Sequence, residues 1–127
     1  MEEEPKILII EDEPLFARLC RDFLEKKGFS ASVAVDGAEG LEKFKKERPD
    51  LVILDILLPK VSGHEVLQKI RENPDPKLAK TPVIVLTNLS QEEAKERLKK
   101  LGADCYLVKT AITTDDLLVK VKEFLGK

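Results

Sequence analysis

Short apolar runs recur along the chain, and amphipathic segments separate them. Such runs, without strict alternation of polar residues, are typical of strands buried on both faces of a parallel sheet. The central run, residues 51–54, follows Pro49-Asp50 and ends in the carboxylate of Asp55. We therefore predict five strands, at residues 6–10, 30–35, 51–54, 83–86 and 105–108.

The segments after the strands repeat apolar residues at helical spacing, which predicts one helix after each strand. Pro14 favours the first turn of the first helix, and Gly28 ends that helix. Asp36 can cap the second helix, and Pro49 closes it. The apolar positions are Leu15, Phe16, Leu19, Cys20, Phe23 and Leu24 in the first helix, and Ala38, Leu41 and Phe44, expected to point inward, in the second.

The third predicted helix follows Gly63 and ends at the Pro-rich breaker of residues 73–76. Ser90 and Glu93 have the spacing of a capping box, which predicts a helix over residues 90–101. The last helix begins at one of two threonines and turns apolar residues inward; these are Thr113 or Thr114, then Leu117, Leu118, Val121, Phe124 and Leu125.

Five strands alternating with five helices predict one α/β domain over residues 1–127. Right-handed crossovers would stack them as a five-stranded parallel sheet between two helical layers, a doubly wound (βα)5 sandwich of flavodoxin-like topology.

Composition excludes several classes of function. The net charge is −2, and the lysines and arginines alternate with glutamates, which is typical of solvated helix faces and not of a nucleic-acid footprint. The apolar runs are too short to span a bilayer, and the acidic start is unlike a secretory signal. Two cysteines form neither a disulfide framework nor a zinc motif. We expect a cytoplasmic protein without direct contacts to nucleic acid or membrane.

Polar side chains gather where the predicted strands end: Glu11 and Asp12 after the first, Asp55 after the third, Thr87 after the fourth and Lys109 after the fifth. The carboxyl ends of the strands are where an open α/β sheet binds ligands. Three carboxylates in one crevice repel one another unless a cation lies among them. Mg²⁺ suits this set, because it prefers one or two carboxylates, waters and a phosphate oxygen.

Asp55 is placed as a nucleophile that can hold a phosphoryl group as an acyl phosphate. The transfer needs positioning and charge neutralisation, which the metal, the Lys109 ammonium and the Thr87 hydroxyl can supply. The backbone carbonyl of Leu57 can complete the metal site, so we predict Mg²⁺ ligands at Glu11, Asp12, Asp55 and Leu57.

This order of residues resembles the receiver domain of two-component response regulators, over essentially the whole chain; the motif is Glu11-Asp12, Asp55, Leu58-Pro59 with Gly63, Thr87 and Lys109. The resemblance implies that Asp55 takes its phosphoryl group from a phosphohistidine of a sensor histidine kinase or a phosphotransfer protein. It further implies that Thr87 and Tyr106 form a switch pair, in which the hydroxyl moves toward the phosphoryl group and the ring turns inward.

The resemblance also implies a partner surface for a downstream effector, made by the family's fourth helix, fifth strand and fifth helix, here residues 91–101 and 104–125. We expect a stand-alone receiver that is a monomer or a weak, activation-dependent homodimer. It would be a switch and not an enzyme on other substrates, because it would catalyse only its own phosphorylation and dephosphorylation.

Three residues depart from the family pattern. Thr110 follows Lys109 where proline is usual, so a cis peptide is not expected there. Asn88 replaces a small residue, and Glu11 replaces the commoner aspartate. These departures keep open an alternative, a pseudo-receiver that binds proteins without phosphorylation. A flavin-binding protein is disfavoured by the acidic first loop, and an aspartyl phosphatase by Leu57, where a second acid is expected.

Overall fold

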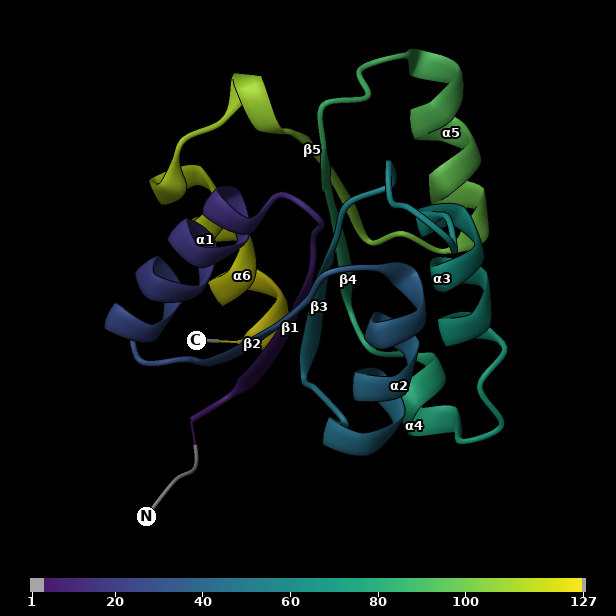
Figure 1. Ribbon diagram of the computed structural model, residues 1–127, viewed down its shortest axis with the longest axis horizontal. Coiled ribbons are helices and arrows are strands. Elements are labelled where there is room, and N and C mark those ends of the chain that lie inside the picture. The colour runs from purple at the N-terminus through teal and green to yellow at the C-terminus, as the bar shows by residue number, and fades with distance from the viewer. Residues whose placement is uncertain (1–3, 127) are drawn as a thin grey trace.

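The computed structural model describes residues 4–126, which form one parallel sheet covered by helices on both faces (Figure 1). The acidic start at residues 1–3, used above to argue against a secretory signal, lies outside the described residues. The strands lie in the order β2-β1-β3-β4-β5, which confirms the predicted doubly wound α/β fold. Their bounds are β1 (Lys6–Ile10), β2 (Ser30–Ala34), β3 (Leu51–Leu54), β4 (Val83–Thr87) and β5 (Cys105–Val108).

The helices are α1 (Pro14–Lys26), α2 (Gly37–Glu47), α3 (Gly63–Arg71), α4 (Pro76–Ala79), α5 (Glu92–Leu101) and α6 (Thr114–Leu125). Figure 1 shows α1 and α6 on one face of the sheet and α2, α3 and α5 on the other. The single turn of α4 was not predicted, because its segment is rich in turn residues. Asp75 caps this turn by accepting a hydrogen bond from the Lys77 amide, and Leu78 is buried beneath it.

The core has two parts, one on each side of the sheet. Along β1, Leu8 and Ile10 face the α2–α3–α5 layer, and Ile7 and Ile9 face the α1–α6 layer. Successive side chains of a strand point to opposite faces, so a strand covered on both sides must be apolar at every position. None of the helices in residues 4–126 has the length and apolar character needed to cross a membrane.

The prediction that Ala38 points inward is wrong, since Ala38 is exposed. The buried residues of α2 are Gly37, Gly40 and Phe44. A Cβ added at Gly40 would lie 2.7 Å from the Cδ1 atom of Ile10, so at this position a larger residue would require the Ile10 side chain to shift. Glycine occupies two of the three buried positions of this helix, which an apolar pattern does not reveal.

Leu15 and Leu19 of α1 are also exposed, at 69% and 58%, although both belong to the apolar repeat. The buried residues of this helix are Ala17, Cys20 and Leu24, which lie on one face. The apolar stripe is therefore wider than the face that one helix can bury against this sheet.

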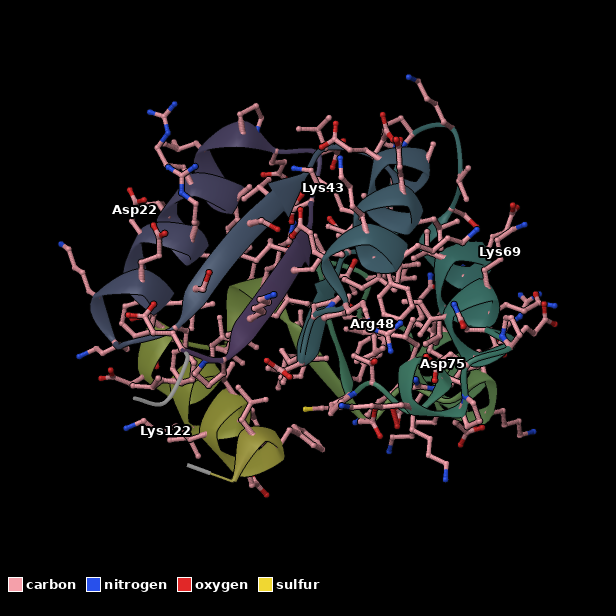
Figure 2. The ribbon with its side chains drawn as sticks, turned by 90° about the horizontal axis from the view of Figure 1, so that it is seen from below. Asp22, Lys43, Arg48, Lys69, Asp75 and Lys122 are labelled. Carbon is pink, nitrogen blue, oxygen red and sulfur yellow. The ribbon has the colours of Figure 1, made fainter. Side chains whose placement is uncertain are left out.

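The predicted capping box of Ser90 and Glu93 is wrong, because α5 begins at Glu92 and its N-cap is Gln91, which makes no side-chain capping bond. Ser90 thus lies one residue outside the cap. At α6 the two open alternatives resolve to Thr113, whose hydroxyl accepts from the Asp116 amide while the Asp116 carboxylate accepts from the Thr113 amide. Figure 2 shows charged side chains of both signs at the periphery, among them Asp22, Lys69 and Lys122.

Candidate functional site

The site lies where β1 and β3 end side by side in the middle of the sheet. Ile10 pairs with Leu54 in parallel register, so the next residues, Glu11 and Asp55, are brought together. The Asp55 amide donates to the Ile10 carbonyl at 3.0 Å, which fixes the backbone of Asp55 just beyond β3. From β1 the chain crosses to β2 on one side, and from β2 it crosses back to β3 on the other side of β1, so this is the switch point at which doubly wound sheets bind ligands.

Lys109, which directly follows the edge strand β5, completes the cluster. The Nζ atom of Lys109 lies 2.9 Å from Oδ2 of Asp55 and 2.5 Å from Oε1 of Glu11, and these three side chains are at most 5% exposed. The Oε1 atom of Glu13 is more distant, at 3.6 Å, and more exposed. Burial favours a lower pKa for Lys109, but its bonds to Glu11 and Asp55 outweigh burial and raise that pKa, so the side chain stays an ammonium.

Backbone amides orient the two buried carboxylates. The Leu57 amide donates to Oδ1 of Asp55 at 3.1 Å, and the Glu13 amide donates to Oε2 of Glu11 at 3.0 Å. Each carboxylate therefore has one oxygen on an amide and the other on the ammonium. Burial is the main cause that raises the pKa of Glu11 to about 7, and the charge of Asp55 adds to it.

The acids fit a hard divalent cation. Glu11, Asp12 and Asp55 each offer a carboxylate oxygen, and these oxygens lie within 4.8 Å of one another. Opposite ligands of Mg²⁺ are separated by about 4.2 Å, twice its usual bond length to oxygen, so small side-chain shifts bring the three oxygens into one coordination shell. Carboxylate oxygens are also the donors that Mg²⁺ prefers. Metal ligation by these acids and by the Leu57 carbonyl remains a prediction.

Gly63 keeps the loop after Asp55 in place. A Cβ at this position would lie 2.5 Å from the carbonyl oxygen of Asp55 and 2.5 Å from Cα of Ile56. These are backbone atoms, which cannot move aside as a flexible side chain can. The first residue of α3 can therefore be nothing larger than glycine without displacing the backbone that carries the Asp55 side chain.

The two predicted switch residues meet at the loop between β4 and α5. Thr87 is fully buried, and its Oγ1 accepts from the Leu89 amide at 3.4 Å. The half-buried Tyr106 donates its hydroxyl to the carbonyl of Leu89. Burial, and then the charge of Asp55, raises the pKa of Tyr106, which keeps this hydroxyl a donor. Both residues thus bond to one position, although their switching remains a prediction.

Sequence reasoning missed one neighbour of the lysine. The ring of Phe16 in α1 lies with its centroid 4.5 Å from Nζ of Lys109. Helical spacing marked Phe16 as apolar, but no sequence signal indicated that its ring faces an ammonium. Of the residues that depart from the family pattern, Asn88 and Thr110 are both exposed. No peptide bond among residues 4–126 is cis, and the chain after β5 forms a 3-10 turn, Lys109–Ala111.

The fold and this cluster define the class of protein, a flavodoxin-like α/β domain with buried acids bridged by a lysine at its switch point. The sequence matches the response regulator receiver domain family over residues 7–122. The chain therefore belongs to the receiver domains of two-component signalling, as the motif predicted.

Similar proteins include receivers of different overall length. The chain is 39% identical over 123 residues to the DNA-binding dual master transcriptional regulator RpaA of Synechocystis, a match that covers 97% of this chain and 50% of RpaA. It is 33% identical to the polar-differentiation response regulator DivK of Brucella anthropi, covering 94% of this chain and 95% of DivK. Thus it spans about half the length of RpaA and of several other regulators that it matches.

Solved structures agree with this assignment. A CheY-like response regulator receiver domain protein from Methanospirillum hungatei superposes with a TM-score of 0.89 at 31% identity, covering 98% of this chain and 95% of that one. The match covers nearly the whole of both chains.

Proposed function

We propose that this receiver domain accepts a phosphoryl group on Asp55 from a phosphohistidine of a sensor kinase or phosphotransfer protein. The observation that carries the proposal is the Lys109 ammonium, which bridges Asp55 and Glu11 in a buried cluster at the strand ends. A phosphoryl group bound there would meet a positive charge already in position. Membership of the receiver family supports the same chemistry.

In this reaction a carboxylate oxygen of Asp55 attacks phosphorus, and the new O–P bond forms as the P–N bond to the donor imidazole breaks. The electron pair goes to that nitrogen, which takes up a proton from solvent. Lys109 would neutralise charge on one phosphoryl oxygen, and the Thr87 hydroxyl would donate to another. Mg²⁺, held by Glu11, Asp12, Asp55 and the Leu57 carbonyl, would neutralise further charge on the phosphoryl oxygens.

Phosphorylation would change the contacts that Thr87 and Tyr106 make with Leu89. A Thr87 hydroxyl that turns to the phosphoryl group would give up its bond to the Leu89 amide, and Tyr106 would turn in the space vacated. The effector surface would be formed by α5, β5 and α6, which are the family's fourth helix, fifth strand and fifth helix because α4 is an additional turn.

Membership of the receiver family suggests the location and the partners of this protein. We expect a cytoplasmic protein that meets a kinase or phosphotransfer protein at one time and an effector at another, with no direct contact to nucleic acid. The match covers 95% of DivK and 50% of RpaA, so the chain resembles both a receiver of similar length and the receiver part of a longer regulator. Activation would leave a monomer or produce a weak homodimer; unchanged mass in solution after phosphorylation would count against the dimer.

The test is the intact mass of the protein after incubation with Mg²⁺ and acetyl phosphate. We expect one phosphoryl adduct that requires Mg²⁺ and disappears in Asp55→Asn. Asp50→Asn is the matched control, because Asp50 is an exposed acid at the other end of β3, and it should keep the adduct. No adduct on folded wild-type protein would refute the proposal and favour the pseudo-receiver.

A further inference from the structure

The Lys109 ammonium has four close neighbours in the described part of the chain, and they are of two kinds. Three are carboxylates, from Glu11, Glu13 and Asp55. The fourth is the face of the Phe16 ring, with its centroid 4.5 Å away. An ammonium within about 6 Å of a ring centroid is attracted by the ring quadrupole, and more strongly where water is excluded. The Lys109 side chain is 5% exposed, which meets that condition.

The Phe16 ring packs against the core of the domain. Phe16 lies in the first turn of α1, which Pro14 begins, and it packs against the core on the α1–α6 side of the sheet. Aromatic rings in such packing have few alternative rotamers. The packing of the ring against the core therefore helps to set its position beside Lys109.

An open space lies beside both the lysine and the Phe16 ring. A mostly apolar cavity of about 110 Å³ lies beside Lys109, and its lining includes Phe16, Cys20, Ile112 and Leu117. Within this lining, the Phe16 ring is the apolar group that lies directly against the ammonium, with its centroid 4.5 Å from Nζ.

We propose that Phe16 is a positioning residue for Lys109 during phosphoryl transfer to Asp55, an inference that rests on the proposed function. Glu11 and Asp55 are also predicted metal ligands, so the two nearest partners of the ammonium are shared with the cation. The Phe16 ring has no oxygen to offer a hard cation. Its contact with the ammonium therefore persists when the carboxylates turn to the metal, and it keeps Lys109 aimed at Asp55.

Two substitutions distinguish the effect of losing the aromatic ring from the effect of losing apolar side-chain volume. Phe16→Leu removes the ring and keeps an apolar side chain, whereas Phe16→Tyr keeps the ring. Phe23→Leu is the matched control, because Phe23 lies on the same helix and also contacts a lysine, with its centroid 5.6 Å from Nζ of Lys27. If Phe16→Leu does not fold, Phe16→Met takes its place, because the unbranched methionine side chain adapts better to an irregular space.

The first readout is the rate of adduct formation with acetyl phosphate at saturating Mg²⁺. We expect Phe16→Leu to slow it about fivefold or more, which corresponds to the loss of one cation–π contact. Phe16→Tyr should restore the rate, and Phe23→Leu should match wild type. The Mg²⁺ affinity of Phe16→Leu should stay within about twofold of wild type, since the ring does not ligate the metal.

The second readout needs neither metal nor phosphate. In the NMR spectrum of the metal-free protein, ring currents should shift the ε-methylene protons of Lys109 upfield, and Phe16→Leu should abolish the shift. An unshifted Lys109 resonance in wild type, or a wild-type rate in Phe16→Leu, overturns the inference and leaves the proposed function intact. A wild-type protein that accepts no phosphoryl group overturns the proposed function, and the positioning role with it.

Discussion

The guanidinium of Arg71, at the end of α3, joins three parts of the chain that lie far from the site. Its Nη1 atom donates to the carbonyls of Ala79 and Thr81 at 2.8 Å each. Its Nε and Nη2 atoms donate to the Gly102 carbonyl at 3.0 and 2.8 Å, and Nη2 also donates to Asp104 at 2.8 Å. The side chain is 21% exposed, so water reaches it only in part. This cluster anchors the carboxyl end of α5 to α3 and to the segment before β4.

We predict that Arg71→Met lowers the free energy of unfolding by about 3 kcal/mol. The substitution keeps the apolar stem and removes every donor, so three carbonyls and one carboxylate lose a charged partner. A hydrogen bond to a charged group is worth about 1.5–3 kcal/mol, and partial access of water to these acceptors reduces the sum to about that of one or two such bonds. A loss of about 3 kcal/mol is a large share of the 5–15 kcal/mol typical of a domain.

Arg48→Met is the matched control, because Arg48 also makes an ion pair at 2.8 Å, to Asp75, but on the surface. Both side chains are exposed, at 52% and 37%, and Figure 2 shows them close together. Solvent screens such a pair, so its removal should leave stability nearly unchanged. In urea denaturation, with a slope of about 2 kcal/mol per molar, Arg71→Met should lower the midpoint by about 1.5 M. Equal midpoints for the two variants would refute the argument from buried acceptors.

Two further predictions concern the site. Burial raises the pKa of Glu11 to about 7, so this carboxyl is mainly protonated at pH 6 and ionised at pH 8. Because a cation competes with the proton, the apparent Mg²⁺ affinity of the wild-type protein in calorimetric titration should rise about tenfold from pH 6 to pH 8. A flat profile would contradict the role of Glu11. Gly63→Ala should lower the free energy of unfolding by about 2 kcal/mol in urea denaturation and slow phosphorylation of Asp55, because the added Cβ overlaps the Asp55 carbonyl. A Gly63→Ala protein as stable and as reactive as wild type would show that the backbone there can move aside without cost.

Much of the fold could be predicted because a parallel sheet requires apolar strands. Residues 51–54 are fully apolar and fully buried, and the pattern could hardly have come from a half-exposed strand. The helix faces were less predictable, because burial there depends on how closely each helix approaches the sheet. Ala38 was expected to point inward, but it is exposed, and Gly40 is the residue of α2 that lies against Ile10. Hydrophobicity alone does not report such distances.

The acidic part of the candidate site was predictable for a related reason. Parallel strands in register bring their carboxyl ends to one edge, so Glu11 and Asp55 had to be neighbours once β1 and β3 were adjacent. Their location depends on backbone geometry, which apolar patterns and strand order determine. The meeting of Thr87 and Tyr106 at Leu89 was not predictable in the same way, because it depends on the path of one loop.

The partners of Lys109 show where sequence reasoning ends. A lysine stem is long enough to reach any of several acids, and the sequence alone does not show that Lys109 contacts Glu11 and Asp55. The contact with Phe16 depends in addition on the rotation of α1, which places Phe16 toward the site and Leu15 toward solvent. A one-residue shift in the register of that helix would put Leu15 in the place of Phe16. Pro14, which fixes the first turn, is therefore the residue on which the geometry around Lys109 most depends outside the cluster itself.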